Sequence, residues 1–408
     1  MSKMNAADSK HPQADGSYFH KREFCFTLEG DIFVRYQSFS NGEDLKKAVK
    51  DRCPAKIDIG PVYNVDPQRR GAYAAGQKFC PEERELVFDI DLTDYDDVRT
   101  CGKEAHICTS CWPLMAAAID ILDKSLREDF GFEHIFFVFS GRRGVHAWVC
   151  DDRARHLTDE ARSAIASYLS VYKGHEKGMA KLNTGLESHP FIHKAHEILA
   201  PKFEHVILPK QRLLDEEEHA ENILKFIPSE SLRNTIRSEW EKKASKNEGY
   251  DSVAKWDTLQ HCVRREIANI SKSNPREVRT VRLLEKSLKD IVFAYTYPRL
   301  DVEVSKKMNH LLKAPFSVHP KTGKVCVPIN PQRAWEFDPD TVCTVGQLLN
   351  ELNANGELQS ENEDPAWKST KMCQAVETFE QCFLNGMQAE NKSILMSRMK
   401  DTPSTLAW

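Results

Sequence analysis

The sequence has no apolar run that approaches the ~18 residues needed to cross a membrane. Its longest compact apolar runs, such as Ile135 to Phe139, have the length of a β-strand. The first residues, MSKMNAADSKHPQADGSY, are polar and lack the apolar stretch of a secretory signal. We therefore expect an intracellular protein that does not enter the membrane.

An excess of charge of one sign is also missing, because 57 Lys and Arg stand against 61 Asp and Glu, a net charge of −4. This balance argues against a nonspecific nucleic-acid coat but is compatible with a local basic groove. Hydrophobic residues make up 40% of the chain, which is enough for a sizeable core and excludes wholesale disorder. Nine of the 12 cysteines are scattered singly, which indicates free thiols in a reducing compartment.

The length of 408 residues suggests two or three units at roughly 150 residues each. Alternating patterns predict strands, and apolar residues at helical spacing predict helices. We expect an α+β fold, with a mixed β-sheet core that is interrupted by an inserted helical subdomain. The expected parts are a disordered segment 1–20, a first core part 21–155, a helical subdomain 156–292, a second core part 293–345, and an acidic linker and helix 346–408. Strands are expected within 23–39, 56–62, 85–92, 134–151, 299–304 and 324–328, and helices at 112–126, after Thr158 and near 372–396.

Asp89 and Asp91 in ELVFDIDL form the strongest single feature. Alternation in a strand places both side chains on one face, about 6.6–7 Å apart along the backbone. Two carboxylates at the end of an apolar strand repel each other unless a cation lies between them, and hard oxygen ligands suit Mg²⁺ or Mn²⁺. The alternative is a solvated acidic turn.

Asp301 in PRLDVE has a similar setting, with an apolar residue before it on a stretch of β pattern. Three carboxylates from two strands would match a two-metal site for phosphoryl transfer. Taken alone, Asp301 also fits a salt-bridge partner.

The turn Ser140-Gly-Arg-Arg-Gly-Val-His146 joins two apolar strands. Its glycines permit a close approach of the backbone to a ligand, and Arg142 and Arg143 at its tip favour a shared anion such as phosphate. His146 adds a donor. A surface hairpin with solvated arginines is the alternative.

Arg35, Lys313 and His319 are weak signals when each is taken alone. Together with the two-arginine turn they would give a cationic lining for a triphosphate opposite an acidic metal site. Nucleotidyl transfer needs this pairing of opposite fields, because charge develops on phosphate oxygens in the transition state.

Cys101, Cys108 and Cys111 lie within eleven residues, with His106 between them. Three thiolates and an imidazole at this spacing predict a structural Zn²⁺ site. A redox Cys-x-x-Cys is the alternative, but it leaves Cys101 and His106 unexplained.

Several strings resemble the small catalytic subunits of eukaryotic DNA primase, in the archaeo-eukaryotic primase family. They run in order from about residue 20 to 330 and include HKREFCFTL, KIDIG, ELVFDIDLTDYDDVR, ICTSCW, SGRRGVHAWVCD and YPRLDVEVSKKMNHLLKAPFSVHPKTGK. The resemblance implies a mixed α/β core, a helical subdomain and a zinc knuckle at 101–111. The implied activity is DNA-templated synthesis of short RNA primers for the initiation of DNA replication.

The resemblance also implies roles for single residues. Asp89, Asp91 and Asp301 match the Mg²⁺- or Mn²⁺-binding carboxylates, and Asp58 matches a residue near the ribose of the incoming nucleotide. The positions that match nucleotide contacts are Arg35, Ser140, Arg142, Arg143, His146, Lys313 and His319. The implied partners are a large iron–sulfur subunit, the DNA polymerase alpha complex, single-stranded DNA template, RNA primer and ribonucleoside triphosphates, in the nucleus.

One departure concerns the zinc ligands. The family pattern has two adjacent cysteines where this chain has Cys101-Gly102, so His106 is the expected replacement. Two other functions remain open on the residues alone: a metal-dependent phosphohydrolase or nuclease, and a catalytically silent subunit that only docks partners.

Overall fold

The structure is a computed structural model that describes residues 17–72, 78–176, 179–186, 189–246, 249–274, 276–356 and 366–401. Of the expected disordered segment 1–20, residues 1–16 lie outside these ranges, as does most of the expected acidic linker. For residues 17–20 the prediction is wrong, because they form a turn and the start of a short helix, and Tyr18 is 3% exposed. The described residues fall into two compact units. The first takes residues from Met1–Asp89, Ser125–Ala166 and Asp301–Trp408, and the second from Ile90–Lys124 and Ser167–Leu300. Helices and antiparallel sheets are both present, so the mixed α+β class is confirmed.

The first unit contains two sheets. One has the order β10-β3-β1-β2, with β4 added to β3, and the other has the order β11-β6-β7-β5. The strands are β1 Arg22–Leu28, β2 Ile32–Gln37, β3 Lys56–Tyr63, β4 Pro81–Glu83, β5 Leu86–Asp91, β6 Ile135–Phe139, β7 Gly144–Val149, β10 Leu312–Lys313 and β11 Pro328–Ile329. The expected strands at 23–39, 56–62, 85–92 and 134–151 are therefore confirmed.

The helices of this unit include two that continue into the second unit, α2 Trp112–Glu128 and α4 Asp159–Leu169. The others are α1 Gly42–Arg52, α3 Asp152–Arg155, α11 Val302–Lys306, α12 Val345–Gly356, α13 Met372–Phe379 and α14 Asn385–Asp401. Short helical turns are η2 Phe19–Lys21, η3 Pro67–Ala72, η6 Pro331–Glu336, η7 Pro339–Thr341, η8 Ala366–Ser369 and the π-helical η9 Glu380–Leu384, which joins α13 to α14.

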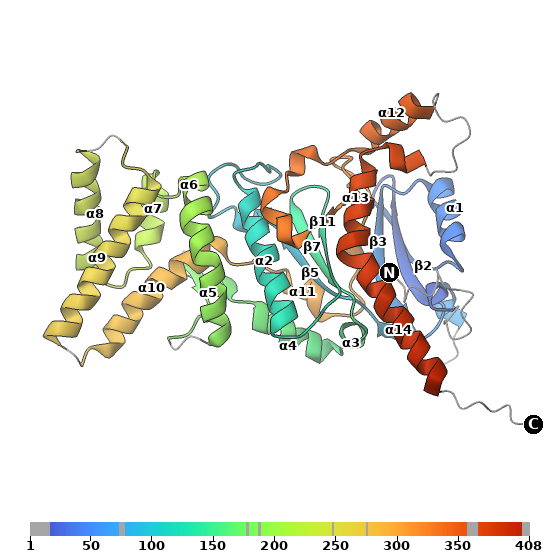
Figure 1. The fold of residues 1–408 in the computed structure, drawn as a ribbon, viewed down its shortest axis with the longest axis horizontal. Coiled ribbons are helices and arrows are strands. Elements are labelled where there is room, and N and C mark those ends of the chain that lie inside the picture. Colours follow the sequence, from blue (N-terminus) through green and yellow to red (C-terminus); the bar gives the residue numbers. More distant parts are fainter. Residues whose placement is uncertain are drawn as a thin grey trace, which may run out of the picture. The chain divides into compact units, whose positions relative to one another are not determined.

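The C-terminal helices cover the sheet that contains β5. The ring of Phe136 on β6 lies 4.9 Å from that of Phe379 and 5.0 Å from that of Phe383, centroid to centroid. These rings belong to a buried cluster that also contains Val87 of β5 and Val304 of α11. The apolar face of the 372–396 segment, read from its sequence, is thus used to hold this sheet (Figure 1).

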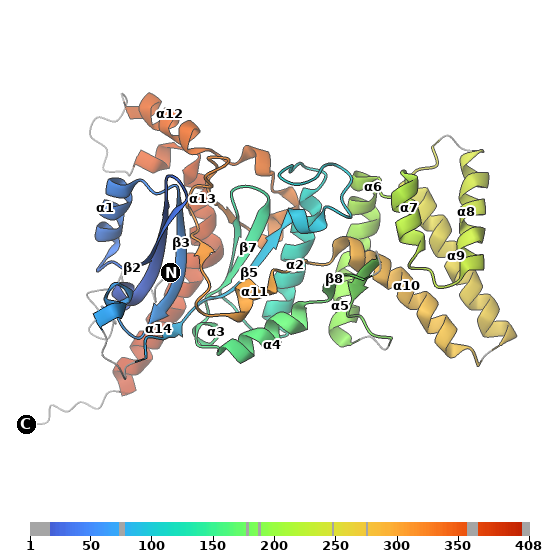
Figure 2. The ribbon, with the colours of Figure 1, turned by 180° about the vertical axis from the view of Figure 1, so that it is seen from behind.

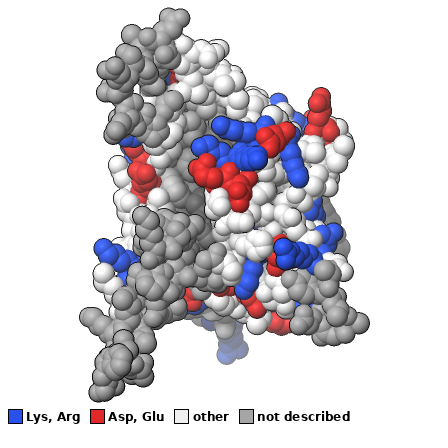
Figure 3. All heavy atoms as spheres, turned by 90° about the vertical axis from the view of Figure 1, so that its right-hand side faces the viewer, with Lys and Arg blue, Asp and Glu red and all other residues white. Residues whose placement is uncertain are grey.

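The surface of the first unit mixes charges of both signs. Lys46 on α1 pairs with Glu43 one turn earlier, at 3.4 Å. Figure 3 shows Lys and Arg side chains next to Asp and Glu side chains on one face, rather than a continuous basic surface. This agrees with the near balance of charge in the sequence.

The second unit is mainly helical, and it also carries a β-hairpin that the sequence analysis did not predict. Its elements are η4 Leu92–Tyr95, β8 Tyr172–Glu176, β9 Met179–Leu182, α5 Pro190–Lys202, the π-helical η5 Phe203–Ile207, α6 Leu208–Gln211, α7 Glu217–Leu224, α8 Glu230–Ala244, α9 Ser252–Ser273 and α10 Val278–Thr296. Helices α8 and α9 lie side by side in both ribbon views (Figures 1 and 2). No described helix has the length and apolar character that a membrane span requires.

Candidate functional site

Strand β5 positions the first two acidic residues, and a buried ion network fixes where it starts. Arg22 Nη2 donates to Glu85 Oε1 at 2.7 Å, and Arg84 Nη1 donates to Glu85 Oε2 at 3.0 Å. Burial alone would raise the pKa of Glu85, but the two guanidinium groups hold it well below its usual value. The buried Glu85 carboxylate is thus paired with two guanidinium groups directly before Leu86, the first residue of β5.

Asp89 and Asp91 lie on one face of β5. Ile90 between them is fully buried, whereas both aspartates are partly exposed. Asp91 Oδ1 accepts hydrogen bonds from the Thr93 backbone N–H at 2.9 Å and from the Thr93 hydroxyl at 2.8 Å. These two bonds fix the direction of the Asp91 carboxylate.

The third acidic residue, Asp301, does not lie on a strand as expected. Residues 299–304 do not form a strand, so that prediction is wrong. Asp301 instead caps the short helix α11, where its Oδ1 accepts from the Glu303 backbone N–H at 3.1 Å. A side-chain cap satisfies an N–H at the helix start that otherwise lacks a partner.

Two hydrogen bonds still place Asp301 beside β5. The backbone N–H of Asp301 donates to the carbonyl of Asp89 at 3.0 Å, and the Ser305 hydroxyl donates to the carbonyl of Val87 at 2.6 Å. Residues more than two hundred positions apart are joined in this way. The acidic segments therefore meet, as the sequence predicts, although through a helix cap.

The turn between β6 and β7 is closed by its own serine. Ser140 Oγ accepts from the Gly144 backbone N–H at 2.9 Å, and Gly141 has a φ of 84°, which favours glycine. His146, which is 4% exposed, follows in β7 with its Nε2 at 3.5 Å from Asp89 Oδ1. The strand that leaves the turn, β7, thus lies next to the acidic strand β5.

A second loop packs against this turn. Lys313 Nζ donates to the carbonyl of Ser140 at 2.9 Å, and Thr322 Oγ1 donates to that of Gly141 at 2.6 Å. A Cβ atom on Gly141 would lie only 2.7 Å from His319 Cβ, so the approach of the two loops requires glycine. The structure therefore brings Ser140, Lys313 and His319 together.

Positively charged side chains gather where the 140–146 turn meets Lys313 and His319, and we call this place the cationic junction. Burial and the neighbouring positive charges both affect the pKa values of its groups. Burial, followed by the charges of Lys313 and Arg142, lowers the pKa of His319 to about 4. Burial also lowers the pKa of Lys313. Groups that are pushed toward their neutral form by burial and like charge would be relieved by a bound anion.

Asp58 lies opposite Lys313 in the register of β3 and β10. It is 5% exposed, and its Oδ2 is 2.9 Å from Lys56 Nζ. Asp58 therefore lies beside Lys313 at the cationic junction, and its carboxylate is paired with Lys56.

Arg35 is anchored by a residue that the sequence analysis did not single out. Glu23 on β1 is fully buried, and it accepts from Arg35 Nε at 3.0 Å, from Arg35 Nη2 at 3.3 Å and from the Tyr63 hydroxyl at 3.1 Å. The Tyr36 backbone N–H adds a fourth bond at 3.2 Å. The feature of the sequence that could have revealed this role is a glutamate next to the apolar residues FCF, because a buried carboxylate needs polar partners.

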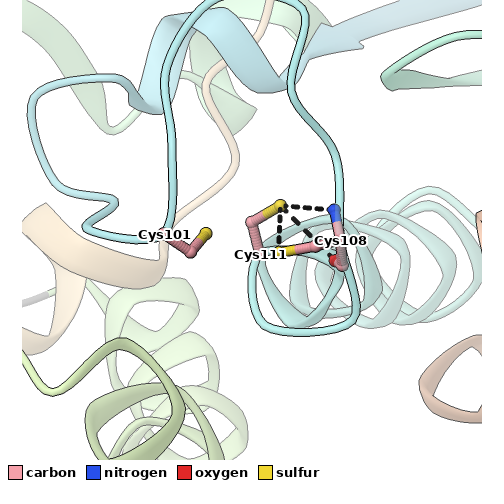
Figure 4. A group of neighbouring side chains, drawn as sticks. All are labelled: Cys101, Cys108 and Cys111. Atoms are coloured by element: carbon pink, nitrogen blue, oxygen red, sulfur yellow. Dashed lines mark hydrogen bonds between the residues drawn. The ribbon is translucent and has the colours of Figure 1, made fainter.

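The three cysteines of the second unit form a compact sulfur group, shown in Figure 4. The Sγ atoms of Cys101, Cys108 and Cys111 all lie within 4.8 Å of one another, which makes them the one group with metal-binding geometry among the described residues. Asp89, Asp91 and Asp301 do not form a group that tight. Gln211 Nε2 donates to Cys101 Sγ at 3.4 Å, which fixes that sulfur from α6.

His106 is not part of this sulfur group. Its imidazole instead lies where a side chain at position 102 would point, because a Cβ atom on Gly102 would collide with His106 Cδ2. The ring thus fills the space next to Cys101 that the missing side chain leaves.

Comparison with known proteins matches residues 88–331 to the family model described as DNA primase small subunit. The chain is 44% identical over 345 residues to the DNA primase small subunit of Schizosaccharomyces pombe, covering 83% of this chain and 72% of the relative. It is 39% identical over 395 residues to that of Drosophila melanogaster, covering 93% of this chain and 87% of the relative. The match to the Saccharomyces cerevisiae protein is 34% over 338 residues, covering 83% and 79%.

Proposed function

The chain belongs to the DNA primase small subunit family, a family of primer-synthesising nucleotidyltransferases that act in DNA replication, and we propose a residue-level account of how it works. Asp89, Asp91 and Asp301 hold two divalent ions, Mg²⁺ or Mn²⁺. The observation that carries this proposal is the backbone hydrogen bond from Asp301 to Asp89, which joins the two acidic segments.

These carboxylates suit such ions. Their oxygens are hard donors, and the turn bonds of Asp91 and Asp301 pre-orient them. Divalent ions held by these carboxylates would supply activation of the primer 3′-hydroxyl and stabilisation of the departing pyrophosphate. His146 near Asp89 donates toward the phosphates from the edge of the acidic group.

The cationic junction holds the triphosphate of the incoming ribonucleotide. Arg142 and Arg143 present planar forks that match phosphate oxygens, and Lys313 supplies a point charge. Lys313 is already oriented by the Ser140 carbonyl. His319 is neutral before binding, so it donates one hydrogen bond without adding to the repulsion.

Arg35 completes the triphosphate contacts, and Asp58 accepts a hydrogen bond from the ribose 2′-hydroxyl. For Asp58 this requires the Lys56 ammonium to share or leave the carboxylate. Lys56 is the partner with access to solvent, because its side chain is 26% exposed and that of Asp58 only 7%. The template is single-stranded DNA, and the product is a short RNA primer.

Zn²⁺ is held by Cys101, Cys108 and Cys111, with His106 as the fourth ligand. The three sulfurs are already gathered, and the ring of His106 occupies the space of the side chain that Gly102 lacks. Soft thiolates with one imidazole make a closed structural site. The partners of the chain are a large iron–sulfur subunit and the DNA polymerase alpha complex, and the compartment is the nucleus.

The triphosphate contacts are tested with the double variant Arg142→Ala/Arg143→Ala. Equilibrium binding of a ribonucleoside triphosphate should weaken by roughly 100-fold, because two charge-assisted forks are lost. Arg333→Ala, which removes an exposed arginine paired with Glu336, is the control. Unchanged nucleotide binding in the double variant, with lost primer synthesis, would place the two arginines elsewhere in the reaction.

A further inference from the structure

Gln211, the last residue of α6, joins two separate parts of the cysteine group from inside the second unit. Its side chain is buried, with the residue only 1% exposed. The amide oxygen Oε1 accepts from the Thr100 backbone N–H, directly before Cys101, at 2.8 Å. The amide nitrogen Nε2 donates to the Ser110 carbonyl, directly before Cys111, at 2.6 Å. One buried amide therefore holds both chain segments that carry these cysteines.

The chemistry of the two backbone partners fixes which way the Gln211 amide faces. A backbone N–H can only donate and a backbone carbonyl can only accept, so the oxygen faces Thr100 and the nitrogen faces Ser110. The amide nitrogen carries two hydrogens, and the second one is directed at Cys101 Sγ, 3.4 Å away. In this orientation Gln211 offers the sulfur a hydrogen-bond donor and not a lone pair.

Backbone atoms and a neighbouring side chain strengthen this attachment of α6. The Thr100 hydroxyl donates to the backbone carbonyl of Gln211. Lys210 Nζ donates to the carbonyl of Thr109, between Cys108 and Cys111, at 3.4 Å. The end of α6 thus contacts the segments on both sides of the cysteine group, more than a hundred positions away in the sequence.

We propose that Gln211 is a positioning residue of the Zn²⁺ site, a role that rests on the proposed binding of zinc by Cys101, Cys108 and Cys111. Gln211 holds the two segments at the spacing that the ion needs, and it donates a hydrogen bond to the Cys101 thiolate. A thiolate bound to zinc keeps negative charge on its sulfur, and an N–H directed at that sulfur stabilises the charge and orients the ligand. Loss of such a supporting group typically weakens metal binding by about 10- to 100-fold.

Two variants of the full chain test this role. Gln211→Glu keeps the shape of the side chain and its bond from the Thr100 N–H, but it turns a lone pair toward the Ser110 carbonyl and the Cys101 sulfur. Release of zinc to a chromophoric chelator should be at least about tenfold faster than in the parent chain. Gln211→Met removes both donors without adding charge and should also release zinc faster, so it carries the test if Gln211→Glu does not fold.

Co²⁺ in place of Zn²⁺ gives a readout that a loss of stability does not move. The charge-transfer band from sulfur to cobalt depends on the charge of the ligating sulfur, so it should shift in both Gln211 variants. The control is Thr184→Val, which removes a buried hydroxyl that donates to Asp290 in the same unit. This control should lower the thermal unfolding midpoint but keep the zinc release and the band position of the parent chain.

Three results would overturn the proposal, and they separate its failure from that of the zinc site. Zinc release at the parent rate in the folded Gln211 variants would show that the residue does not support the site. Faster release with an unmoved cobalt band would show that Gln211 acts only on the stability of the unit. A parent chain that holds no zinc, measured by metal analysis, would instead remove the zinc site and this role with it.

Discussion

The backbone N–H of Asp301 donates to the carbonyl oxygen of Asp89 at 3.0 Å, so the helix cap of α11 is tied directly to strand β5. This bond uses only backbone atoms and therefore occupies neither side-chain carboxylate. It predicts that the side chain of Asp301 can be changed without separating the two segments.

Asp301→Asn should reduce templated primer synthesis by at least about 100-fold, because one anionic ligand of the divalent ions is lost. Asparagine is also a good helix cap, so the thermal unfolding midpoint should change by only a few degrees. The matched control is Glu303→Gln in the same helix, whose side chain pairs with Lys306. Equal losses in the two variants would show that the effect comes from α11 and not from the Asp301 carboxylate.

Glu23→Gln should weaken nucleotide binding indirectly, because Glu23 contacts Arg35 and not the nucleotide in the proposed site. The amide keeps the shape of the carboxylate but loses the charge that orients Arg35. Hydrogen bonds to charged groups contribute about 1.5–3 kcal/mol, so KM for ribonucleotides should rise by roughly tenfold or more while kcat changes less.

A double-mutant cycle checks that the effect runs through Arg35. Arg35→Ala and Glu23→Gln/Arg35→Ala should have nearly the same KM, because glutamate has no arginine left to position. Fully additive effects on KM would show that Glu23 acts by some other route, such as the Tyr63 hydroxyl.

His319 gives a prediction about pH. Its pKa is lowered to about 4 by burial and then by Lys313 and Arg142, so the ring is neutral near pH 6 before nucleotide binds. A bound triphosphate supplies negative charge and should raise this pKa. Binding near pH 6 should therefore take up protons, as measured by titration calorimetry in buffers of different ionisation enthalpy. His319→Gln should abolish most of this uptake, and uptake that persists in the variant would assign it to another group.

The same lowered pKa affects stability. Between the unfolded value near 6.5 and the folded value of about 4, the unfolded chain binds more protons at His319 than the folded chain does. The contribution of this group to the free energy of unfolding is thus retained above pH 6.5 and declines as the pH falls toward 4. Denaturant unfolding at pH 7 and pH 5 should show a smaller decline in His319→Gln than in the parent chain.

His106→Ala should release zinc about 10- to 100-fold more readily to a chelator. The ring lies in the space next to Cys101, and the proposed site would lose its fourth ligand without it. Lys103→Ala, in the same loop, should release zinc at the rate of the parent chain. Unchanged zinc retention in His106→Ala would remove His106 from the site and leave three cysteines as its protein ligands.

The sequence predicted most of the first unit because its signals are local. Alternation gave β1, β2, β3 and β5, and the glycines of the turn at 140–144 gave the hairpin of β6 and β7. A strand was wrongly predicted at 299–304 because the apolar residues Leu300, Val302 and Val304 alternate with polar ones, as in a strand. What decides the structure there is Asp301, whose cap bond to Glu303 starts a helix.

Long-range partners could not be predicted from one sequence. The bonds from Lys313 to Ser140 and from Thr322 to Gly141 join loops more than 170 residues apart. No periodicity or spacing links such positions. Glu23 illustrates the same limit, since a buried charge signals a need for a partner but does not say that the partner is Arg35.

Templated polymerisation by the purified chain tests the central claim most directly. Labelled ribonucleotides that include ATP are supplied with poly(dT), without divalent ions, with Mg²⁺ and with Mn²⁺. The account predicts ribonucleotide oligomers that appear only with a divalent ion and only when the template is present. Metal-dependent shortening of the poly(dT), with no ribonucleotide incorporated, would contradict it.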